Sequence, residues 1–449
     1  MELDILSREH GTQDGREERT AVSQDDCEQF VSKNYRWNFG GVLVESSLYS
    51  FVSSLLSVYT VLAYYVGQLS DSRVLIGLVP AISVGGFFVP QLITAKRLRW
   101  APRVRPYLLA GAALQRLGIL GLLVLSAVQP VLAPEITLVL FFAVFIVYSG
   151  ASGIYYPAYG SFVGKAIPQR KGMLLGTSYF LGGLLGLLGS SLLTYLLTNY
   201  DYPRDAQYAF GIAFLASLIS FLVVLKWREP PCDREPRDSS WRSFFGNVRS
   251  LLKHHGNFRK YLLWRAFMTV GEMALPFYLT HAMSKFELSA SHVGVFTLVL
   301  TISQVVMNPI WGWIGDRRGH LNVFVLASLF GAVGAILAAV TQSAAVFYVV
   351  FWGAGAMLSG MQLAGLNILY EFGIADETST LIALSASVLS PLSCLVPILG
   401  GLVAQSVGYS AVFWIAGGAQ AISTLGLALG VKNPVETVGQ EGRGVARIT

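Results

Sequence analysis

Long apolar stretches alternate with short polar ones along almost the whole chain. Each apolar stretch is about 20 residues or longer, enough for a helix to cross a hydrocarbon core roughly 30 Å thick. The strands of a membrane barrel would be shorter and would alternate apolar and polar residues. The pattern therefore predicts twelve membrane-spanning helices, at roughly 38–66, 73–95, 106–130, 135–160, 172–198, 207–226, 259–283, 290–314, 321–342, 344–370, 379–405 and 409–431.

The composition agrees with an all-α integral membrane protein. Hydrophobic residues make up 53% of the chain and charged residues 13%, a balance that does not suit a water-exposed surface. The mean hydropathy of +0.55 is that of a membrane protein. The net charge of +6 does not indicate a nucleic-acid partner, because the basic residues lie in short segments between the apolar stretches.

Basic residues gather in alternate loops. They are abundant in the loops at 96–105, 165–171, 228–260 and 317–318, whereas the opposite loops carry only Arg73, Arg204 and Lys285. Cytoplasmic loops carry an excess of Lys and Arg. We therefore expect a multi-pass protein of the plasma membrane with both termini in the cytosol.

The longest polar interruption divides the twelve spans six and six. We expect a cytosolic tail at 1–37, a six-helix half at 38–226, a linker at 227–258, a second half at 259–431 and a C-terminal tail at 432–449. Within the linker, apolar residues recur at helical spacing between basic ones, which predicts an amphipathic helix on the membrane surface. A weak repeat, with the segments 209–213 and 412–416 opening the sixth and twelfth spans, supports two related halves.

The eighth apolar stretch ends in the sequence WGWIGDRRGH, residues 311–320. Gly312 and Gly319 allow a tight turn and close helix approach. Asp316 can accept hydrogen bonds from the N-terminus of a neighbouring helix, and Arg317 can bind carbonyl or carboxylate groups. A charged latch that two helices make or break can act as a conformational switch.

This stretch resembles the signature loop of the major facilitator superfamily, which reads G-x-x-x-D-R-x-G followed by basic residues. Gly312, Asp316, Arg317 and Gly319 match it position by position, and His320 stands where a basic residue is usual. The resemblance implies a cavity surrounded by spans 1, 4, 7 and 10, and a loop that stabilises one end state of alternating access. At the family's second copy of the loop, between spans 2 and 3, only basic residues are present and there is no Asp.

Charged residues at membrane depth are costly and therefore mark candidate functional sites. Glu272 lies about 12 residues into span 7, roughly 18 Å deep at 1.5 Å per residue. Desolvation there favours the protonated carboxyl group, so Glu272 could load and release a proton during transport. The alternative is a Glu that only ties helices together.

Glu45 in span 1 and Arg116 in span 3 are the other proton-coupling candidates. Both lie about 8 to 10 residues in from the cytosolic side, roughly 12 to 15 Å at 1.5 Å per residue, so they could pair. A structural ion pair is the favoured interpretation, because an unpaired charge at that depth is costly. A coupling role is the alternative, and it requires Arg116 to point inward.

Polar stripes mark the helix faces that could line a pathway. The stripe in span 1 has alternating spacings of four and three, which places its members on one face. The candidates for substrate contact are Ser50, Ser53 and Ser57 in span 1, Tyr148, Tyr155 and Tyr159 in span 4, and Gln362 in span 10. Alternatively, the serines form a packing seam and the tyrosines lie at the membrane interface.

Together these features predict a secondary active transporter for a small organic solute, coupled to protons, with a slight preference for efflux. The rival is a non-transporting membrane sensor or scaffold on the same fold. No phosphate-binding loop, metal-ligand spacing or nucleophile with its base is recognisable, so no enzymatic activity, cofactor or metal site is expected. The expected partners are the solute, protons and the lipid bilayer, with the protein acting as a monomer.

Overall fold

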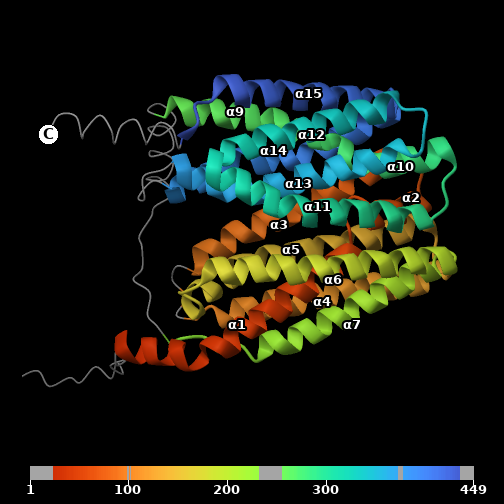
Figure 1. The fold of residues 1–449 in the computed structure, drawn as a ribbon. Coiled ribbons are helices and arrows are strands. Elements are labelled where there is room, and N and C mark those ends of the chain that lie inside the picture. Colours follow the sequence, from red (N-terminus) through yellow and green to blue (C-terminus); the bar gives the residue numbers. More distant parts are fainter. Residues whose placement is uncertain (1–23, 99–100, 102, 232–254, 373–377, 435–449) are drawn as a thin grey trace, which may run out of the picture.

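The computed structural model describes residues 24–98, 101, 103–231, 255–372 and 378–434. Every regular element within these ranges is helical, and the helices form a bundle of two halves (Figure 1). The amphipathic helix expected in the linker lies outside the described residues, as do most of the two predicted tails.

The first half ends before the linker. Its elements are α1 (Gln24–Leu55), α2 (Val61–Leu69), α3 (Arg73–Leu98), α4 (Arg105–Val128), the short 3-10 helix η1 (Gln129–Val131), α5 (Pro134–Ala166), α6 (Lys171–Asn199) and α7 (Arg204–Leu225). Helix α1 begins well inside the predicted tail. Its early residues are held by the segment after α7, because Trp37 donates a hydrogen bond to the Lys226 carbonyl at 2.9 Å.

The second half follows the same plan. Its elements are α9 (Gly256–Gly271), the 3-10 helix η2 (Glu272–Ala274), α10 (Leu275–Phe286), α11 (Ser291–Arg318), α12 (His320–Val340), α13 (Val346–Phe372), α14 (Thr378–Ser406) and α15 (Tyr409–Gly430). Across the two halves, α3 packs against α14 and α6 packs against α11.

Ten helices are long and apolar enough to cross a membrane. They correspond to ten of the twelve predicted spans. The remaining two, at 38–66 and 259–283, are each interrupted. The first consists of α1 and α2 with non-helical residues between them, whereas the seventh runs through α9, η2 and α10 and changes only to a 3-10 turn at Glu272. We call both interruptions breaks. The expected spans run through both breaks, although polar residues and helix-start signals stand there: Ser57 and Thr60 at the first, and Gly271, Glu272 and Pro276 at the second.

Both halves carry the same tie between their first and last helices. Asn38 of α1 donates to the Arg228 carbonyl at 2.9 Å and accepts from the Arg228 amide at 3.0 Å. Asn257 of α9 makes the same two bonds with the backbone of Lys432, at 2.7 and 2.8 Å. We call these the Asn ties. They indicate a structural repeat and mark a common level from which depths along α1 and α9 can be compared.

The halves are joined toward one end of the bundle, far from the Asn ties. Hydrogen bonds between described residues of the two halves lie in this region: Thr60 with Thr297, Ser72 with Gln405, Arg73 with Ala404, Ala81 with Cys394 and Ser190 with Thr301. The guanidinium of Arg73 also lies 4.2 Å from the ring centre of Tyr409. We call this the closed end.

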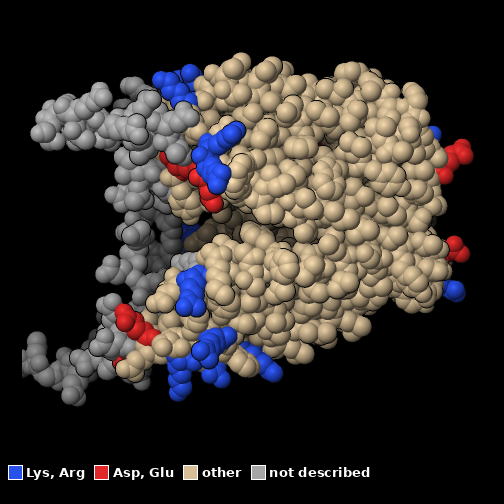
Figure 2. Space-filling view, in the orientation of Figure 1, with Lys and Arg blue, Asp and Glu red and all other residues tan. Residues whose placement is uncertain are grey.

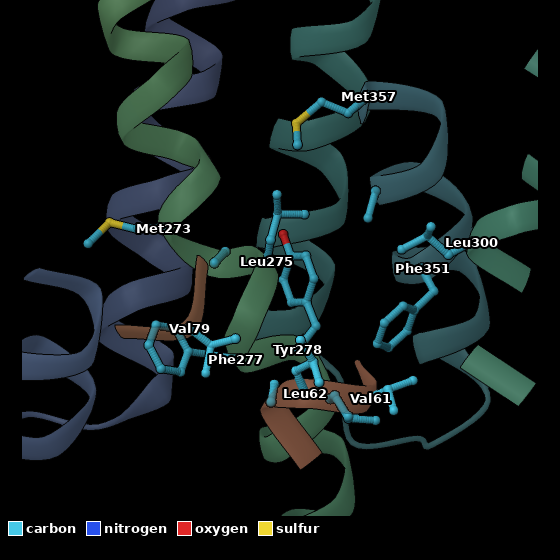
Figure 3. Packing of buried hydrophobic residues seen from close by; sticks show 14 of the residues in the cluster. Val61, Leu62, Val79, Met273, Leu275, Phe277, Tyr278, Leu300, Phe351 and Met357 are labelled. Atoms are coloured by element: carbon cyan, nitrogen blue, oxygen red, sulfur yellow. The ribbon is translucent and has the colours of Figure 1, made fainter. Parts of the chain in front are cut away.

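Glycine and apolar packing seal the closed end. Gly77 of α3 lies against the Pro397 backbone of α14, where a Cβ would collide, so these helices approach closely only because the residue is glycine. Just inside this contact, Leu62 of α2 packs near Phe277 and Tyr278 of α10 in one cluster of buried apolar side chains (Figure 3). Burial of this surface holds the halves together at this end.

The opposite end is open and charged. Figure 2 shows Lys and Arg side chains gathered there, around a hollow between the two halves. This charged end includes Lys96, Arg97, Lys165, Arg228, Arg317 and Arg318. The described residues therefore form a bundle that is joined at one end and hollowed between the halves toward the other.

Candidate functional site

The two broken helices meet at the interface between the halves. One break lies between Leu55 and Val61, and the other falls at Glu272, which follows the last residue of α9. Tyr59, in the first break, lies close to Glu272. Broken membrane helices are where transporters commonly hold substrates and ions. The candidate site is therefore centred on Glu272.

Glu272 forms an ion pair with Arg265, two helical turns earlier in the chain. Nη1 of Arg265 lies 3.3 Å from Oε1 of Glu272 and donates to Oγ1 of Thr269 at 3.1 Å. The spacings of four and seven residues place all three side chains on one helix face. The side chains of Arg265 and Glu272 are 13% and 16% exposed. Each charge is tolerated at this depth because the other compensates it.

Much of the hydrogen-bonding capacity of this pair is unused. Nε and Nη2 of Arg265 and Oε2 of Glu272 make no hydrogen bond with any described residue. None of them is among the fully buried polar atoms that lack a partner, so all three retain contact with open space. Three of the five N–H donors of the guanidinium are consequently available to a ligand.

Packing holds Arg265 in position. Its guanidinium lies 5.3 Å from the ring centre of Phe324 on α12, and Phe324 packs edge-on against Tyr261 at 5.8 Å. Trp264, the residue before Arg265 on α9, packs against Gly426 of α15. Anchored on both sides, α9 presents the free edge of the guanidinium without needing to rearrange.

Glu45 lies seven residues beyond the Asn tie of α1, close to the depth of Arg265, which lies eight residues beyond its own tie. The hydroxyl of Tyr155 donates to Oε1 of Glu45 at 2.8 Å, and Glu45 is only 3% exposed. Arg116 is close enough to interact electrostatically with Glu45. These two described residues nevertheless form no ion pair within 4 Å, so the expected structural pair is wrong.

Arg116 is bound instead by groups of α4 and α7. Its Nε donates to the Ser217 carbonyl and its Nη2 to Oγ of Ser220, both at 3.0 Å. Nη1 donates to the Ala112 carbonyl at 3.2 Å and to Oε1 of Gln115 at 3.0 Å. Every guanidinium nitrogen has a partner and the residue is 8% exposed. The side chain turns toward α7, which satisfies it within the first half.

Part of the serine stripe of α1 packs against α6. Ser46 bonds Ser178 at 3.1 Å, and Ser50 lies against Gly182 while donating to the Ser46 carbonyl. The packing seam therefore accounts for the contacts of Ser50. Ser53 is exposed and Ser57 lies partly exposed at the break, so both remain candidates for substrate contact.

The tyrosines of α5 form an aromatic row. Tyr155 and Tyr159 lie with ring centres 5.8 Å apart, and Tyr148 stacks on Phe145 at 6.1 Å. Tyr155 is buried against Glu45, whereas Tyr148 and Tyr159 are half-buried. Gln362 of α13 is exposed and makes no hydrogen bond with a described residue.

The residues of the predicted latch lie at the charged end, where α11 meets α12. Gly312 lies within α11, and Gly319 joins the helices with a φ of 83°, a conformation that glycine adopts readily. Asp316 is exposed and forms no ion pair or hydrogen bond with a described residue, while Arg317 lies 4.8 Å from the ring centre of Trp313. Among the described residues, the contacts expected of Asp316 in the latch are therefore not formed in this conformation.

Two carboxylates at the charged end were not foreseen from the sequence. The His320 amide, at the start of α12, donates to Glu371 at 3.1 Å, and its ring Nδ1 lies 2.6 Å from the same carboxylate. In the first half, Glu229 accepts from the amides of Val104 and Arg105 at 2.7 and 2.9 Å. A carboxylate at a helix N-terminus is favoured by the helix dipole. Both groups therefore stabilise helix starts.

Arg265 is the most important residue that the sequence interpretation missed. It lies near the start of the predicted span at 259–283, where a basic residue is readily attributed to the membrane surface. The signal that could have found it is the spacing of Arg265, Thr269 and Glu272, which puts opposite charges on one helix face.

The chain matches a known protein family over most of its length. A family model described as the Major Facilitator Superfamily matches residues 42–281 and 261–447. A search of curated proteins finds no match.

Solved structures share the fold at low sequence identity. A mutant of the nucleoside transporter NupG superposes with a TM-score of 0.68 at 14% identity, covering 87% of this chain and 98% of that one. The D-xylose-proton symporter gives 0.65 at 15%, covering 92% and 99%. A mutant of the E. coli fucose:proton symporter FucP gives 0.60 at 13%, covering 89% and 100%. At these identities the likeness concerns the fold alone.

Proposed function

Because the chain belongs to the Major Facilitator Superfamily, we propose that it is a secondary active transporter that moves a small organic solute by alternating access. The observation that carries this proposal is the Arg265–Glu272 pair, which lies at a helix break with unused donors and acceptors. A purely structural ion pair would have its polar atoms satisfied by the protein.

The two ends of the bundle support the alternating-access part of the proposal. The halves are bonded to each other at the closed end and separated by a hollow at the charged end. Rocking one half against the other would close the charged end and open the closed one around a fixed central site. We propose that the charged end is the cytosolic side of the plasma membrane, with both termini there, because cytoplasmic loops carry an excess of Lys and Arg.

Proton coupling is assigned to Glu272. Its carboxylate has a single cationic partner, one direct contact at 3.3 Å, and a second oxygen open to the site. A carboxyl group so placed can take up a proton when Arg265 turns to another ligand, and release it when the pair re-forms. Glu45 lacks such an exchangeable partner and is held by Tyr155.

Export remains the favoured direction, since the sequence carries no signature of a solute-specific importer. The D-xylose-proton and fucose:proton symporters, which share this fold, couple solute movement to protons in their own right. That precedent supports proton coupling here but does not identify the solute. The rival, a sensor or scaffold, requires that no solute crosses the bilayer.

The test is lumenal pH in liposomes containing the purified full-length protein, on addition of pooled candidate solutes. Solute-driven proton flux in the native protein, lost in Glu272→Gln, is the expected result, and subdivision of the active pool leads to the solute. Flux that survives in Glu272→Gln would overturn the assignment of the proton site. Absence of both flux and labelled-solute uptake with every pool would favour the non-transporting rival.

A further inference from the structure

Building on the proposed transport function, we propose that Arg265 is the receptor for a substrate carboxylate and that the solute is a monoanionic organic acid. The carboxylate would bind the free edge of the Arg265 guanidinium and displace Glu272. The juxtaposition of an open guanidinium edge with an exchangeable carboxylate is what assigns this role.

Arg265 has hydrogen-bond donors that the protein leaves unused, whereas Arg116 has none. Arg116 and Arg265 both lie at membrane depth, but all three nitrogens of Arg116 are bonded within the protein. Only Nη1 of Arg265 is bonded, while Nε and Nη2 face open space. Nε and Nη2 form the edge that binds a carboxylate through two parallel hydrogen bonds. The vacant edge therefore has the geometry of a carboxylate site.

A substrate carboxylate would compete with Glu272 for Arg265. Glu272 holds Arg265 through one oxygen at 3.3 Å, which is long for a charge-assisted contact. A substrate carboxylate on the vacant edge makes two such bonds and brings a negative charge that replaces the one supplied by Glu272. In the absence of solute, the Glu272 carboxylate thus occupies the guanidinium that a bound acid would take.

The number of available cations limits the negative charge that the solute can carry. Arg116 is bonded at every guanidinium nitrogen. At the closed end, Arg73 is bonded to the Ala404 carbonyl and lies over the Tyr409 ring, and Lys285 donates to the Thr341 carbonyl at 2.7 Å. Of these four described basic residues, Arg265 is the one with donors available to a central ligand, which suits one negative charge. A sugar phosphate or dicarboxylate would bring charge that nothing here compensates.

Binding of the solute at Arg265 would be coupled to protonation of Glu272. The charged and titratable groups that face Glu272 are Arg265 and Tyr59. Once a solute occupies Arg265, Glu272 is left as an uncompensated carboxylate in a poorly hydrated site, and it takes a proton from the water of the hollow. The loaded site then carries the guanidinium, the anion and a neutral Glu272. Anion and proton would move together. An inward proton gradient then drives uptake, and export requires an outward gradient of the acid that exceeds it.

The experiment detects binding through stabilisation of the native protein, which avoids the passive leak of weak acids through liposomes. Thermal unfolding of the purified full-length protein in detergent is followed by tryptophan fluorescence, with benzoate, phenylacetate and indole-3-acetate, each beside its primary amide. The acids should stabilise the native protein and the amides should not. Arg265→Gln should abolish the stabilisation, and Arg265→Lys, which keeps the charge but loses the planar fork, should weaken affinity about tenfold.

Glu272→Gln is the informative matched variant. Because it removes the internal competitor while leaving Arg265 in place, acid binding should tighten about tenfold. Equal stabilisation by acids and amides, stabilisation retained in Arg265→Gln, or no stabilisation by any acid would overturn the carboxylate assignment.

The two proposals fail separately. Solute-driven flux that is carried by neutral solutes and survives in Arg265→Gln would leave transport standing and refute the carboxylate site. Stabilisation by acids that depends on Arg265, without flux of any solute, would refute transport and leave the carboxylate site standing.

Discussion

The two halves place charged residues at nearly the same depth but satisfy them in different ways. In the first half, Glu45 is bonded by Tyr155 and Arg116 is bonded at every nitrogen, both close to fully buried. In the second half, Arg265 and Glu272 share one direct contact and keep open donors and acceptors.

This difference separates a structural tie from a functional site. Burying a charge is tolerated when the protein supplies all of its partners, as it does for Arg116. Leaving part of a charged group's capacity unused at membrane depth is costly unless water or a ligand fills it. Depth alone therefore does not identify the site, whereas unused hydrogen-bonding capacity does.

The largest expected effect on stability is that of removing Arg116. Arg116→Ala should lower the free energy of unfolding by about 3 kcal/mol, because it removes four hydrogen bonds of a charged group and leaves buried acceptors unpaired. Arg265→Ala should cost less, about 1 kcal/mol, because Glu272 can take up a proton and become neutral once its partner is removed. Unfolding in detergent, followed by tryptophan fluorescence, measures both. Similar losses of unfolding free energy in the two variants would contradict the proposal that Arg116 is a structural residue and Arg265 is not.

The next effect concerns the closed end. Arg73→Ala removes the bond to the Ala404 carbonyl and the stacking on Tyr409, and should shift the conformational equilibrium by about 2 kcal/mol away from the charged-end-open state. Spin-label distances across the closed end measure this shift. Ser72→Ala is the control, because its bond to Gln405 is long at 3.4 Å and exposed. An unchanged distance distribution in Arg73→Ala would refute the gate role.

A smaller effect is expected at Glu45. Tyr155→Phe removes the one hydrogen bond to its carboxylate, which should destabilise the fold by about 1 kcal/mol while solute-driven proton flux continues. The same unfolding and flux assays apply. Loss of flux at unchanged stability would move Glu45 into the transport machinery.

The smallest effect on this state is expected at the latch. Asp316 touches no described residue here, so Asp316→Asn should leave the apparent unfolding temperature unchanged. If the latch forms only when the charged end closes, the variant should increase the population of the open state in spin-label measurements at that end. A drop in unfolding temperature without any population shift would show that Asp316 already acts in the open state.

The fold could be predicted largely from the sequence, because span length and polarity follow directly from bilayer thickness. The family was also readable from Gly312, Asp316, Arg317 and Gly319. The breaks in the first and seventh spans were not predicted, although Gly271 and Pro276 on either side of Glu272 are local signals of a helix interruption. The same holds for the early start of α1, which depends on contacts with the segment after α7.

The candidate site was half predictable. Glu272 was identified from its depth, but its partner Arg265 was not, because a basic residue near the start of a span resembles a membrane-surface residue. The expected Glu45–Arg116 pair failed because equal depth says nothing about direction. Side-chain direction depends on helix rotation, and here α4 turns Arg116 toward Ser217 and Ser220.

The central claim is that the second half carries the transport chemistry and the first half carries structural ties. The most direct test is solute-driven proton flux in liposomes with Glu45→Gln beside Glu272→Gln, the same substitution in each half, at matched protein content. The account predicts flux near the native level in Glu45→Gln and none in Glu272→Gln. Flux lost in Glu45→Gln and retained in Glu272→Gln would contradict it.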